Sequence, residues 1–309
     1  MIQACNLTKA FGDFVAVEDL SFKVNKGDIL AFLGPNGAGK STTMKMLTGY
    51  LTPNSGHALI MGVNIQKDPI KAKGYIGYLP ESTASYKSMT VVEFLRFMAE
   101  VRGLKGDQIQ SRVEAVMKQT HLTQVATQTI ETLSKGFRQR VGFAQALVHD
   151  PPVLILDEPT DGLDPNQKHE MRNLIKSMSE NKAVILSTHI LEEMEALATR
   201  CIIIDEGKIV FDGTPAELIL LSKSHHEITI TFESEIPQGL DDQIKELEGV
   251  SNVSSNKNNQ LTVHPTEGQN LLHSVNHFLQ DHHSHILEIH LEKGQMEEVF
   301  RNLTAGELV

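Results

Sequence analysis

Short apolar runs alternate with amphipathic segments from the start of the chain to about residue 215. Runs such as Ile29–Leu33, Val153–Leu156 and Ala183–Leu186 are too short for helices, and turn-forming residues bound them, so we expect buried strands. Between these runs the apolar residues recur with helical spacing. This alternation predicts an α/β fold with a mostly parallel sheet.

The same pattern locates further elements. Early strands are predicted at Ile2–Lys9 and Phe14–Val24, and a hairpin is predicted at Cys201–Ile204 and Lys208–Phe211. Helices are predicted at Thr90–Arg102, Gly106–His121, Gly136–His149, Asn166–Met178 and Ile190–Ala198. Thr90 and Asp107 stand near the first two helix starts as candidate caps.

The composition changes near residue 222, where polar residues and histidines become frequent. We therefore expect one domain over residues 1–221, with a helical subdomain at about 88–150, and a small α+β domain over residues 222–309. Within the second domain the predicted strands are Glu227–Phe232, Leu261–His264 and His285–Leu291, and the predicted helices are Asp241–Glu248 and Gly268–Gln280. The polar stretch Ser251–Gln260 is expected to be a mobile loop.

Composition limits the function classes. The chain of 309 residues has a formal net charge of −11, which argues against a nucleic-acid partner because phosphate backbones attract clustered Lys and Arg. No apolar run approaches the ~18 residues that span a bilayer, and the first residues lack the pattern of a signal peptide. Cys5 and Cys201 both fall in strand-like segments and are expected to be buried thiols in a reducing, cytoplasmic compartment.

A glycine-rich loop between a predicted strand and a predicted helix is the strongest chemical signal. It consists of Gly34, Pro35, Asn36, Gly37, Ala38, Gly39, Lys40, Ser41 and Thr42. The spacing matches a phosphate-binding loop, in which backbone N–H groups and the lysine hold the phosphates and the Ser41 hydroxyl suits Mg²⁺. A chance match in a glycine-rich turn is the alternative, and the strand–helix context argues against it. The loop predicts binding of a nucleoside triphosphate.

A second signal is the pair of carboxylates Asp157 and Glu158, which follows the apolar run Val153–Leu156. Ligands of parallel sheets bind at the carboxyl ends of the strands, so we expect Asp157 to bind Mg²⁺ and Glu158 to polarise the attacking water. A solvated acidic turn is the plainer alternative, but it does not explain the phosphate loop beside it.

Leu133-Ser-Lys-Gly-Phe-Arg-Gln-Arg140 resembles the signature motif of ATP-binding-cassette (ABC) ATPases. The common form is Leu-Ser-Gly-Gly-Gln, and this chain keeps Ser134 and Gly136 while Lys135 and Phe137 depart from it. That variant is similar to the subgroup of ATPases that drive drug- and ion-exporter-like or gliding-motility-like systems. The resemblance implies a P-loop ABC core with an antiparallel β subdomain and a helical subdomain. It also implies a head-to-tail homodimer in which Ser134 and Gly136 meet the γ-phosphate held by the other copy.

Three more positions match the family in order along the chain. Phe11 matches the aromatic residue that stacks on adenine, Asp164 matches the loop near the dimer seam, and His189 matches the histidine that holds the γ-phosphate. The plainer interpretation of Phe11 is a core aromatic, and that of His189 is a histidine with a structural hydrogen bond. The resemblance covers roughly residues 2–215.

Glu81 is a departure from the family pattern, because the family usually has Gln at this place. The residue retains an oxygen that suits Mg²⁺ but loses an amide donor. We expect altered coupling to the transport partner rather than an inactive enzyme. A surface glutamate outside the site is the alternative.

The resemblance therefore predicts an ATPase subunit that uses ATP and Mg²⁺ and powers transport through separate transmembrane permease subunits, on the cytoplasmic face of the membrane. The coupling groove is expected at 81–90 and 128–132. A soluble repair or translation ATPase is the first alternative, and a P-loop kinase or GTPase is the second.

The end of the chain is less informative. Residues 291–300 are similar to a tail motif of the exporter-like subgroup, which suggests an accessory domain for dimerisation or regulation. His273, His277, His282, His283 and His285 form a candidate transition-metal cluster, and a solvated polar face is the alternative.

Overall fold

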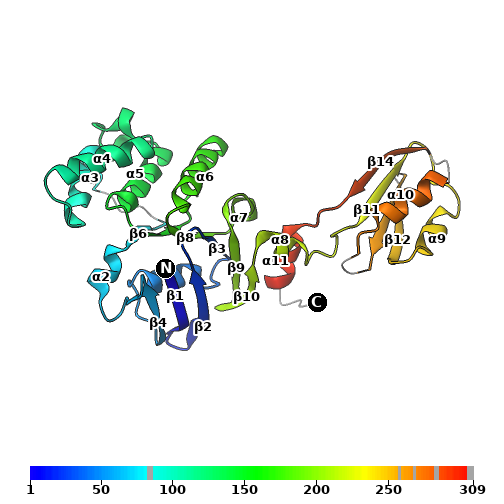
Figure 1. Ribbon diagram of the computed structural model, residues 1–309, viewed down its shortest axis with the longest axis horizontal. Helices are drawn as coiled ribbons and strands as arrows, with labels where there is room; N and C mark the ends of the chain where they lie inside the picture. The colour runs from blue at the N-terminus through cyan, green and yellow to red at the C-terminus, as the bar shows by residue number, and fades with distance from the viewer. Residues whose placement is uncertain (82–85, 257–258, 267–268, 282–284, 305–309) are drawn as a thin grey trace. The chain divides into compact units, whose positions relative to one another are not determined.

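The computed structural model describes residues 1–81, 86–256, 259–266, 269–281 and 285–304 (Figure 1). The chain divides into two compact units, Met1–Pro215 and Ala216–Val309. Each unit has its own hydrophobic core, so each is described separately.

A six-stranded sheet forms the centre of the first unit. Its strand order is β10 (Lys208–Gly213), β9 (Arg200–Asp205), β3 (Ile29–Leu33), β8 (Ala183–Thr188), β7 (Val153–Asp157) and β6 (Ile76–Leu79). All neighbouring strands are parallel except the β9–β10 hairpin. Every residue of β3, β7 and β8 is buried, which explains their continuous apolar sequences. The predicted parallel core and hairpin are confirmed.

A second sheet in this unit is antiparallel. Its order is β2 (Phe14–Val24), β1 (Ile2–Phe11), β4 (Ser55–Ile60) and β5 (Val63–Asn64). The ring centroids of Phe22 on β2 and Phe32 on β3 lie 5.6 Å apart, so the two sheets share one core. The tight β1–β2 connection places Phe11 opposite Phe14 at the end of the hairpin.

Helices join the strands of the first unit. They are α1 (Lys40–Leu47), α2 (Pro69–Gly74), α3 (Val91–Val101), α4 (Asp107–Gln119), α5 (Lys135–Leu147), α6 (Pro165–Ser179) and α7 (Leu191–Leu197), with short 3₁₀ turns η1 (Thr123–Val125) and η2 (Ile130–Thr132). Figure 1 shows α3, α4 and α5 grouped together.

Two helix starts test the predicted caps. Thr90 forms a reciprocal capping box with Glu93 at the start of α3. The expectation for Asp107 is wrong, since Gly106 occupies the cap position and Asp107 lies in the first turn. A carboxylate in the first turn is still favourable because of the helix dipole.

The second unit contains a sheet ordered β12 (Val250–Asn256), β13 (Gln260–Pro265), β11 (Ile228–Phe232) and β14 (Ile286–Leu291), and every pair is antiparallel. Helix α9 (Leu240–Lys245) follows β11, and α10 (Leu272–Asp281) precedes β14. This βαββαβ order is that of a ferredoxin-like fold. Short helices α8 (Pro215–Ile219) and α11 (Met296–Thr304) complete the unit.

The expectation of a mobile loop at Ser251–Gln260 is wrong, because β12 occupies most of it. The segment Val250-Ser-Asn-Val-Ser-Ser-Asn256 has little strand propensity of its own. Pairing with β13 makes it a strand, and its hydrogen bonds are tertiary information that local composition does not contain.

Candidate nucleotide-binding and catalytic site

A cavity of about 310 Å³ collects most of the predicted nucleotide-binding residues. Its lining residues are Phe11, Phe14, Ala16, Asn36, Gly37, Gly39, Lys40, Ser41, Thr42, Glu81 and Glu158. The phosphate loop enters from the end of β3, Glu81 follows β6, and Glu158 follows β7. Residues distant in sequence therefore meet at the carboxyl ends of parallel strands, as ligand sites of such sheets do.

The phosphate loop is held in a compact conformation by its own lysine. Nζ of Lys40 donates hydrogen bonds to the carbonyl oxygens of Gly34 at 2.6 Å and Pro35 at 3.0 Å. Gly39 has φ 107°, and a Cβ there would lie 2.4 Å from the carbonyl oxygen of Ala16. Only glycine fits this approach of the loop to β2. Helix α1 then starts at Lys40, and its first residues Lys40, Ser41 and Thr42 line the cavity, so an anion there would lie near the helix N-terminus.

Of the remaining loop residues, Pro35 and Ala38 line a neighbouring cavity of about 500 Å³ instead. Gly34 lines neither cavity, although its carbonyl oxygen accepts a hydrogen bond from Lys40. The predicted loop is therefore divided between the two cavities.

Asp157 and Glu158 are fixed through the adjacent strand β8. Oγ of Ser187 donates a hydrogen bond to Oδ1 of Asp157, and the backbone N–H of Glu158 donates to the Ser187 carbonyl oxygen at 3.2 Å. Asp157 is 4% exposed. Glu158 has φ 48°, a left-handed conformation that is uncommon for a residue with a side chain and is concentrated at functional sites. This turn directs Glu158 into the cavity.

Glu158 also contacts the predicted histidine. Nδ1 of His189 lies 3.0 Å from Oε1 of Glu158. Burial raises the pKa of the Glu158 carboxyl, and the hydrogen bond and charge of His189 together with Lys40 oppose that rise. A carboxylate whose pKa is raised is a stronger base, which suits proton removal from water.

Three carboxylates surround one buried cation in this site. Burial lowers the pKa of Lys40, while Glu158, Asp157 and Glu81 oppose the effect. Burial likewise raises the pKa of Asp157, with Glu81 adding to the rise and Ser187 opposing it. This excess of hard oxygen donors, joined by the Ser41 hydroxyl in the cavity, fits a divalent cation such as Mg²⁺.

Phe14 is a cavity residue that sequence reasoning missed. It is 62% exposed, pairs with Phe11 in the β1–β2 register, and lines both the nucleotide cavity and the neighbouring one. The available signal is a pair of aromatics flanking the Gly12-Asp13 turn. Two exposed rings at one hairpin end offer a stacking surface for a planar base.

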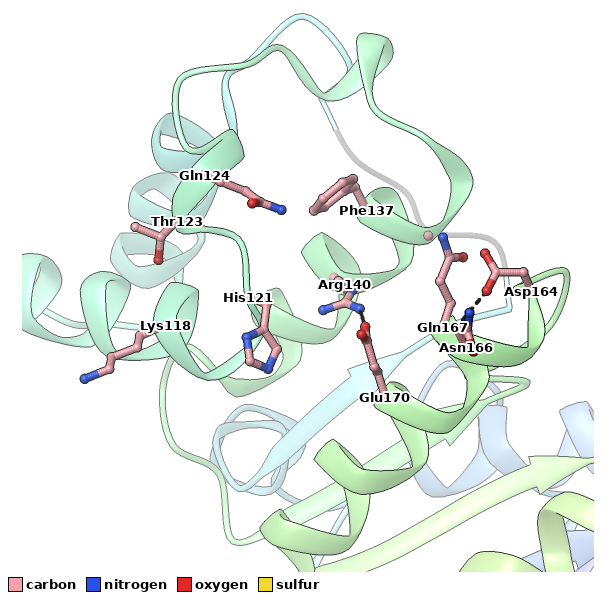
Figure 2. A pocket seen from close by; sticks show the side chains of 11 residues that line it. Lys118, His121, Thr123, Gln124, Phe137, Arg140, Asp164, Asn166, Gln167 and Glu170 are labelled. Carbon is pink, nitrogen blue, oxygen red and sulfur yellow. Dashed lines mark hydrogen bonds and ion pairs between the residues drawn. The ribbon is translucent and has the colours of Figure 1, made fainter.

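The signature segment and the loop at Asp164 meet at a second place (Figure 2). The Ser134 hydroxyl caps α5 by accepting from Phe137 N, and the Asp164 carboxylate caps α6 by accepting from Gln167 N at 2.9 Å. Gly136 and Asp164 line one cavity of about 770 Å³ between these helix starts. A Cβ on Gly136 would lie 2.5 Å from Oε1 of Gln167, so the end of the Gln167 side chain packs against this glycine.

None of Ser134, Gly136 and Asp164 is among the residues that line the cavity of Lys40. A single chain therefore does not bring the two sets of predicted residues onto one ligand site. The α5 helix is instead tied to the loop after β7, because Nε2 of Gln139 donates to the Pro159 carbonyl oxygen at 3.0 Å.

Lys135, which differs from the common signature motif, also joins the signature segment to the loop after β7. Its Nζ pairs with Oδ2 of Asp161 at 3.1 Å, so the signature segment holds the loop that leads to Asp164. Figure 2 also shows Arg140 of α5 paired with Glu170 of α6.

Two segments of the predicted coupling groove lie side by side. Backbone hydrogen bonds join Val91 N to the Gln128 carbonyl at 3.1 Å and Ile130 N to the Met89 carbonyl at 3.0 Å. Tyr86 is 57% exposed and packs its ring edge-on against Phe97 of α3. Residues 82–85 of this groove lie outside the described residues.

Other predicted features have simpler outcomes. Within the described ranges no cluster of three or more His, Cys, Asp or Glu side chains is arranged to hold a metal ion, and His282 and His283 lie outside those ranges. Cys201 is buried and Cys5 only partly so, and neither forms a disulfide, so full burial of Cys5 was a wrong expectation. No helix in the described part of the chain has the length and apolarity to cross a membrane.

Comparison with known proteins gives a consistent result. The family model for ABC transporters matches residues 17–161. The probable multidrug ABC transporter ATP-binding protein YbhF of Escherichia coli (strain K12) is 38% identical over 247 residues, which are 80% of this chain and 43% of YbhF. The chain thus spans less than half the length of that relative.

In two further matches, the aligned region covers a larger share of the similar protein. The linearmycin resistance ATP-binding protein LnrL of Bacillus subtilis (strain 168) is 33% identical over 310 residues, which are 100% of this chain and 99% of LnrL. Among solved structures, cbiO1 from Clostridium perfringens, part of the ABC transporter complex cbiONQ, aligns with a TM-score of 0.64 and 30% identity, covering 70% of this chain and 89% of cbiO1.

Proposed function

This chain belongs to the ABC transporter family as an ATP-binding ATPase subunit, and from that premise we propose that it powers transport through separate transmembrane permease subunits. The observation that carries the proposal is the meeting of the phosphate loop, Glu81 and Glu158 in one cavity, with His189 3.0 Å from Glu158. This arrangement supports a nucleoside-triphosphate site with Glu158 as the base for hydrolysis.

In the proposed reaction the adenine stacks against Phe11 and the phosphates lie in the loop that ends at Ser41. Glu158 accepts a proton from water as the water oxygen bonds to the γ-phosphorus, and the bond to the β–γ bridging oxygen breaks to release ADP and phosphate. His189 orients Glu158 and holds the γ-phosphate, and Lys40 stabilises the negative charge on the phosphate oxygens.

Ser41, Glu81 and Asp157 are the residues that would hold Mg²⁺. When bound, the ion supplies charge neutralisation for the phosphates. Glu81 contributes a charged oxygen at the position where the family usually has a neutral amide. We infer stronger metal contact there and altered coupling to the permease.

Ser134, Gly136 and Asp164 act, in this proposal, on the nucleotide bound to a second copy. Their separation from the cavity of Lys40 within one chain supports a head-to-tail homodimer with two ATP molecules at its interface. ATP binding would bring the copies together, and hydrolysis would separate them.

The exposed segments around Tyr86 and Gln128 are the proposed contact with the permease, which places the protein at the cytoplasmic face of the membrane. We assign residues 1–221 to the nucleotide-binding domain with its helical subdomain at about 88–150, and residues 222–309 to an accessory domain. The similar protein cbiO1 is part of the ABC transporter complex cbiONQ, which is in line with this arrangement.

The test has two parts. Purified wild-type protein should hydrolyse ATP, and Glu158→Gln should bind ATP with similar affinity while turnover falls by roughly a hundredfold or more. Normal turnover in Glu158→Gln would overturn the assignment.

The second part addresses transport. A membrane protein of several spanning helices should copurify stoichiometrically with the tagged chain, and its addition should change the ATPase rate. Copurification with ribosomes or DNA instead would favour the soluble repair or translation alternative.

A further inference from the structure

Glu193 on α7 is a buried carboxylate that the proposed reaction does not use. It is 2% exposed, although glutamate is rarely buried to this extent unless it is paired. An ionised carboxylate carries only acceptor sites, so its partners must be donors. Three donors surround it.

Each donor comes from a different segment. Oγ1 of Thr160 donates to Oε1 of Glu193, and Oγ1 of Thr188 donates to Oε2 at 3.0 Å. Nζ of Lys168 on α6 lies 3.3 Å from Oε1. The carboxylate thus joins the loop after β7, the end of β8 and helix α6.

The two threonines adjoin the catalytic pair. Thr160 lies two residues after Glu158, and Thr188 immediately precedes His189. The Thr188 hydroxyl, besides donating to Glu193, accepts a hydrogen bond from the backbone N–H of Ile190 at 3.1 Å. One hydroxyl therefore fixes the main chain on both sides of His189, and Glu193 fixes the orientation of that hydroxyl.

We propose that Glu193 is a positioning residue that holds the Glu158 and His189 segments in register through Thr160 and Thr188. This inference rests on the proposed roles of Glu158 and His189. Glu193 touches neither the nucleotide cavity residues nor the reacting atoms, so its action is indirect. Misplacement of reacting groups by about 1 Å costs roughly a hundredfold in rate, which sets the expected scale.

The experiment replaces Glu193 by Gln in the full chain. The amide keeps the size of the side chain but turns one acceptor into a donor, so it cannot accept from both threonines and attract Lys168. We expect kcat to fall by roughly tenfold to a hundredfold, with ATP affinity unchanged within about threefold, because the phosphate loop is not involved.

Glu192→Gln is the matched control. Glu192 is the neighbouring residue, its side chain is 77% exposed, and its ion pair with Arg172 at 3.0 Å joins the same two helices. It does not contact either threonine, so its loss should leave kcat unchanged. An equal fall in both variants would show that any α6–α7 ion pair has this effect and would overturn the proposal.

A double-mutant cycle separates positioning from stability. In a His189→Ala background, Glu193→Gln should lower kcat by a clearly smaller factor than in the wild type, because one of the two residues through which it acts is gone. If the two fold-reductions in kcat simply multiply in the double variant, the proposal is contradicted. Thr188→Val, which removes one hydroxyl at nearly constant size, should lower kcat and also be non-additive with His189→Ala. It serves as the test if Glu193→Gln does not fold.

The two proposals fail differently. Retained turnover in Glu158→Gln overturns the proposed reaction. Loss of turnover in Glu158→Gln with normal kcat in Glu193→Gln and Thr188→Val overturns only the role of Glu193.

Discussion

Nδ1 of His189 lies 3.0 Å from Oε1 of Glu158, although the two residues are 31 positions apart in the sequence. Each follows the end of one of two adjacent parallel strands, β7 and β8. The contact is thus a direct product of strand pairing. It places a histidine against the candidate base, and it makes the protonation of Glu158 depend on His189.

The first prediction concerns the pH dependence of turnover. Because burial raises the pKa of Glu158, kcat/KM should fall on the acidic side with a midpoint above the ordinary glutamate range. The hydrogen bond and charge of His189 lower that pKa, so His189→Ala should move the midpoint to still higher pH. Steady-state ATPase assays from pH 5 to 9 measure this midpoint in both proteins.

The matched control for this shift is His169→Ala on the exposed surface of α6, whose histidine bonds to Asn173 instead. It should leave the midpoint in place. If the acidic midpoint of the kcat/KM profile is the same in His189→Ala as in the wild type, the assignment of Glu158 as the titrating base is contradicted.

The second prediction concerns stability. A carboxyl whose pKa is raised in the folded state contributes stability at low pH that is lost as pH rises through the folded pKa. Nucleotide-free Glu158→Gln should therefore have a higher Tm than wild type at pH 8, and the difference should shrink toward pH 5. Scanning calorimetry without nucleotide checks this, and a lower Tm at pH 8 would contradict it.

Parts of this site could be predicted from sequence because they are local. The spacing of Gly34 to Thr42 and the carboxylates after Val153–Leu156 fix chemistry within a few residues of a strand end. The role of Ser187 could not be predicted in this way, because its hydrogen bond to Asp157 depends on which strands are neighbours.

Other features could not be predicted because they also depend on contacts between segments that are distant in the sequence. Glu193 lies in an ordinary amphipathic helix, and nothing local signals that Thr160 and Thr188 converge on it. Strand β12 was missed because its pairing with β13 outweighs its weak intrinsic propensity.

The third prediction concerns Glu81. Its carboxylate lines the cavity and acts on Lys40 and Asp157. Glu81→Gln removes a charged oxygen from the proposed Mg²⁺ site, so half-maximal ATPase activity should require roughly threefold to tenfold more Mg²⁺. A Mg²⁺ titration at fixed ATP measures this, and an unchanged requirement would remove Glu81 from the metal site.

The fourth prediction concerns the two exposed rings. Phe11→Ala and Phe14→Ala should each weaken ATP binding by roughly fivefold, the effect of losing a stacking contact of about 1 kcal/mol. Fluorescent-nucleotide titration measures the affinity. Tyr50→Ala is the control, since Tyr50 is 73% exposed but does not line the cavity. If Phe14→Ala binds ATP with wild-type affinity, Phe14 does not stack on adenine and only Phe11 keeps that role.

The fifth prediction concerns His149. Burial, followed by the charge of Arg102, lowers its pKa to about 4, and its Nδ1 is buried without a hydrogen-bond partner. The unfolded chain binds a proton near pH 6.5 while the folded chain does not, so stability is lost as pH falls from about 6.5 toward 4. The free energy of unfolding should therefore decrease between pH 7.5 and pH 5, and His149→Gln should make that decrease smaller by about 1 kcal/mol. Urea unfolding at the two pH values measures it. An identical pH slope in the variant would contradict the assignment.

Light scattering of Glu158→Gln with ATP and Mg²⁺ shows whether two copies share two nucleotides. We expect the mass to rise from the 34.2 kDa of a single chain to twice that value, with two ATP molecules per pair. Ser134→Arg, a substitution outside the cavity of Lys40, should still bind ATP but prevent the pairing. If Glu158→Gln binds ATP fully and keeps the mass of one chain, the protein does not form the proposed head-to-tail dimer.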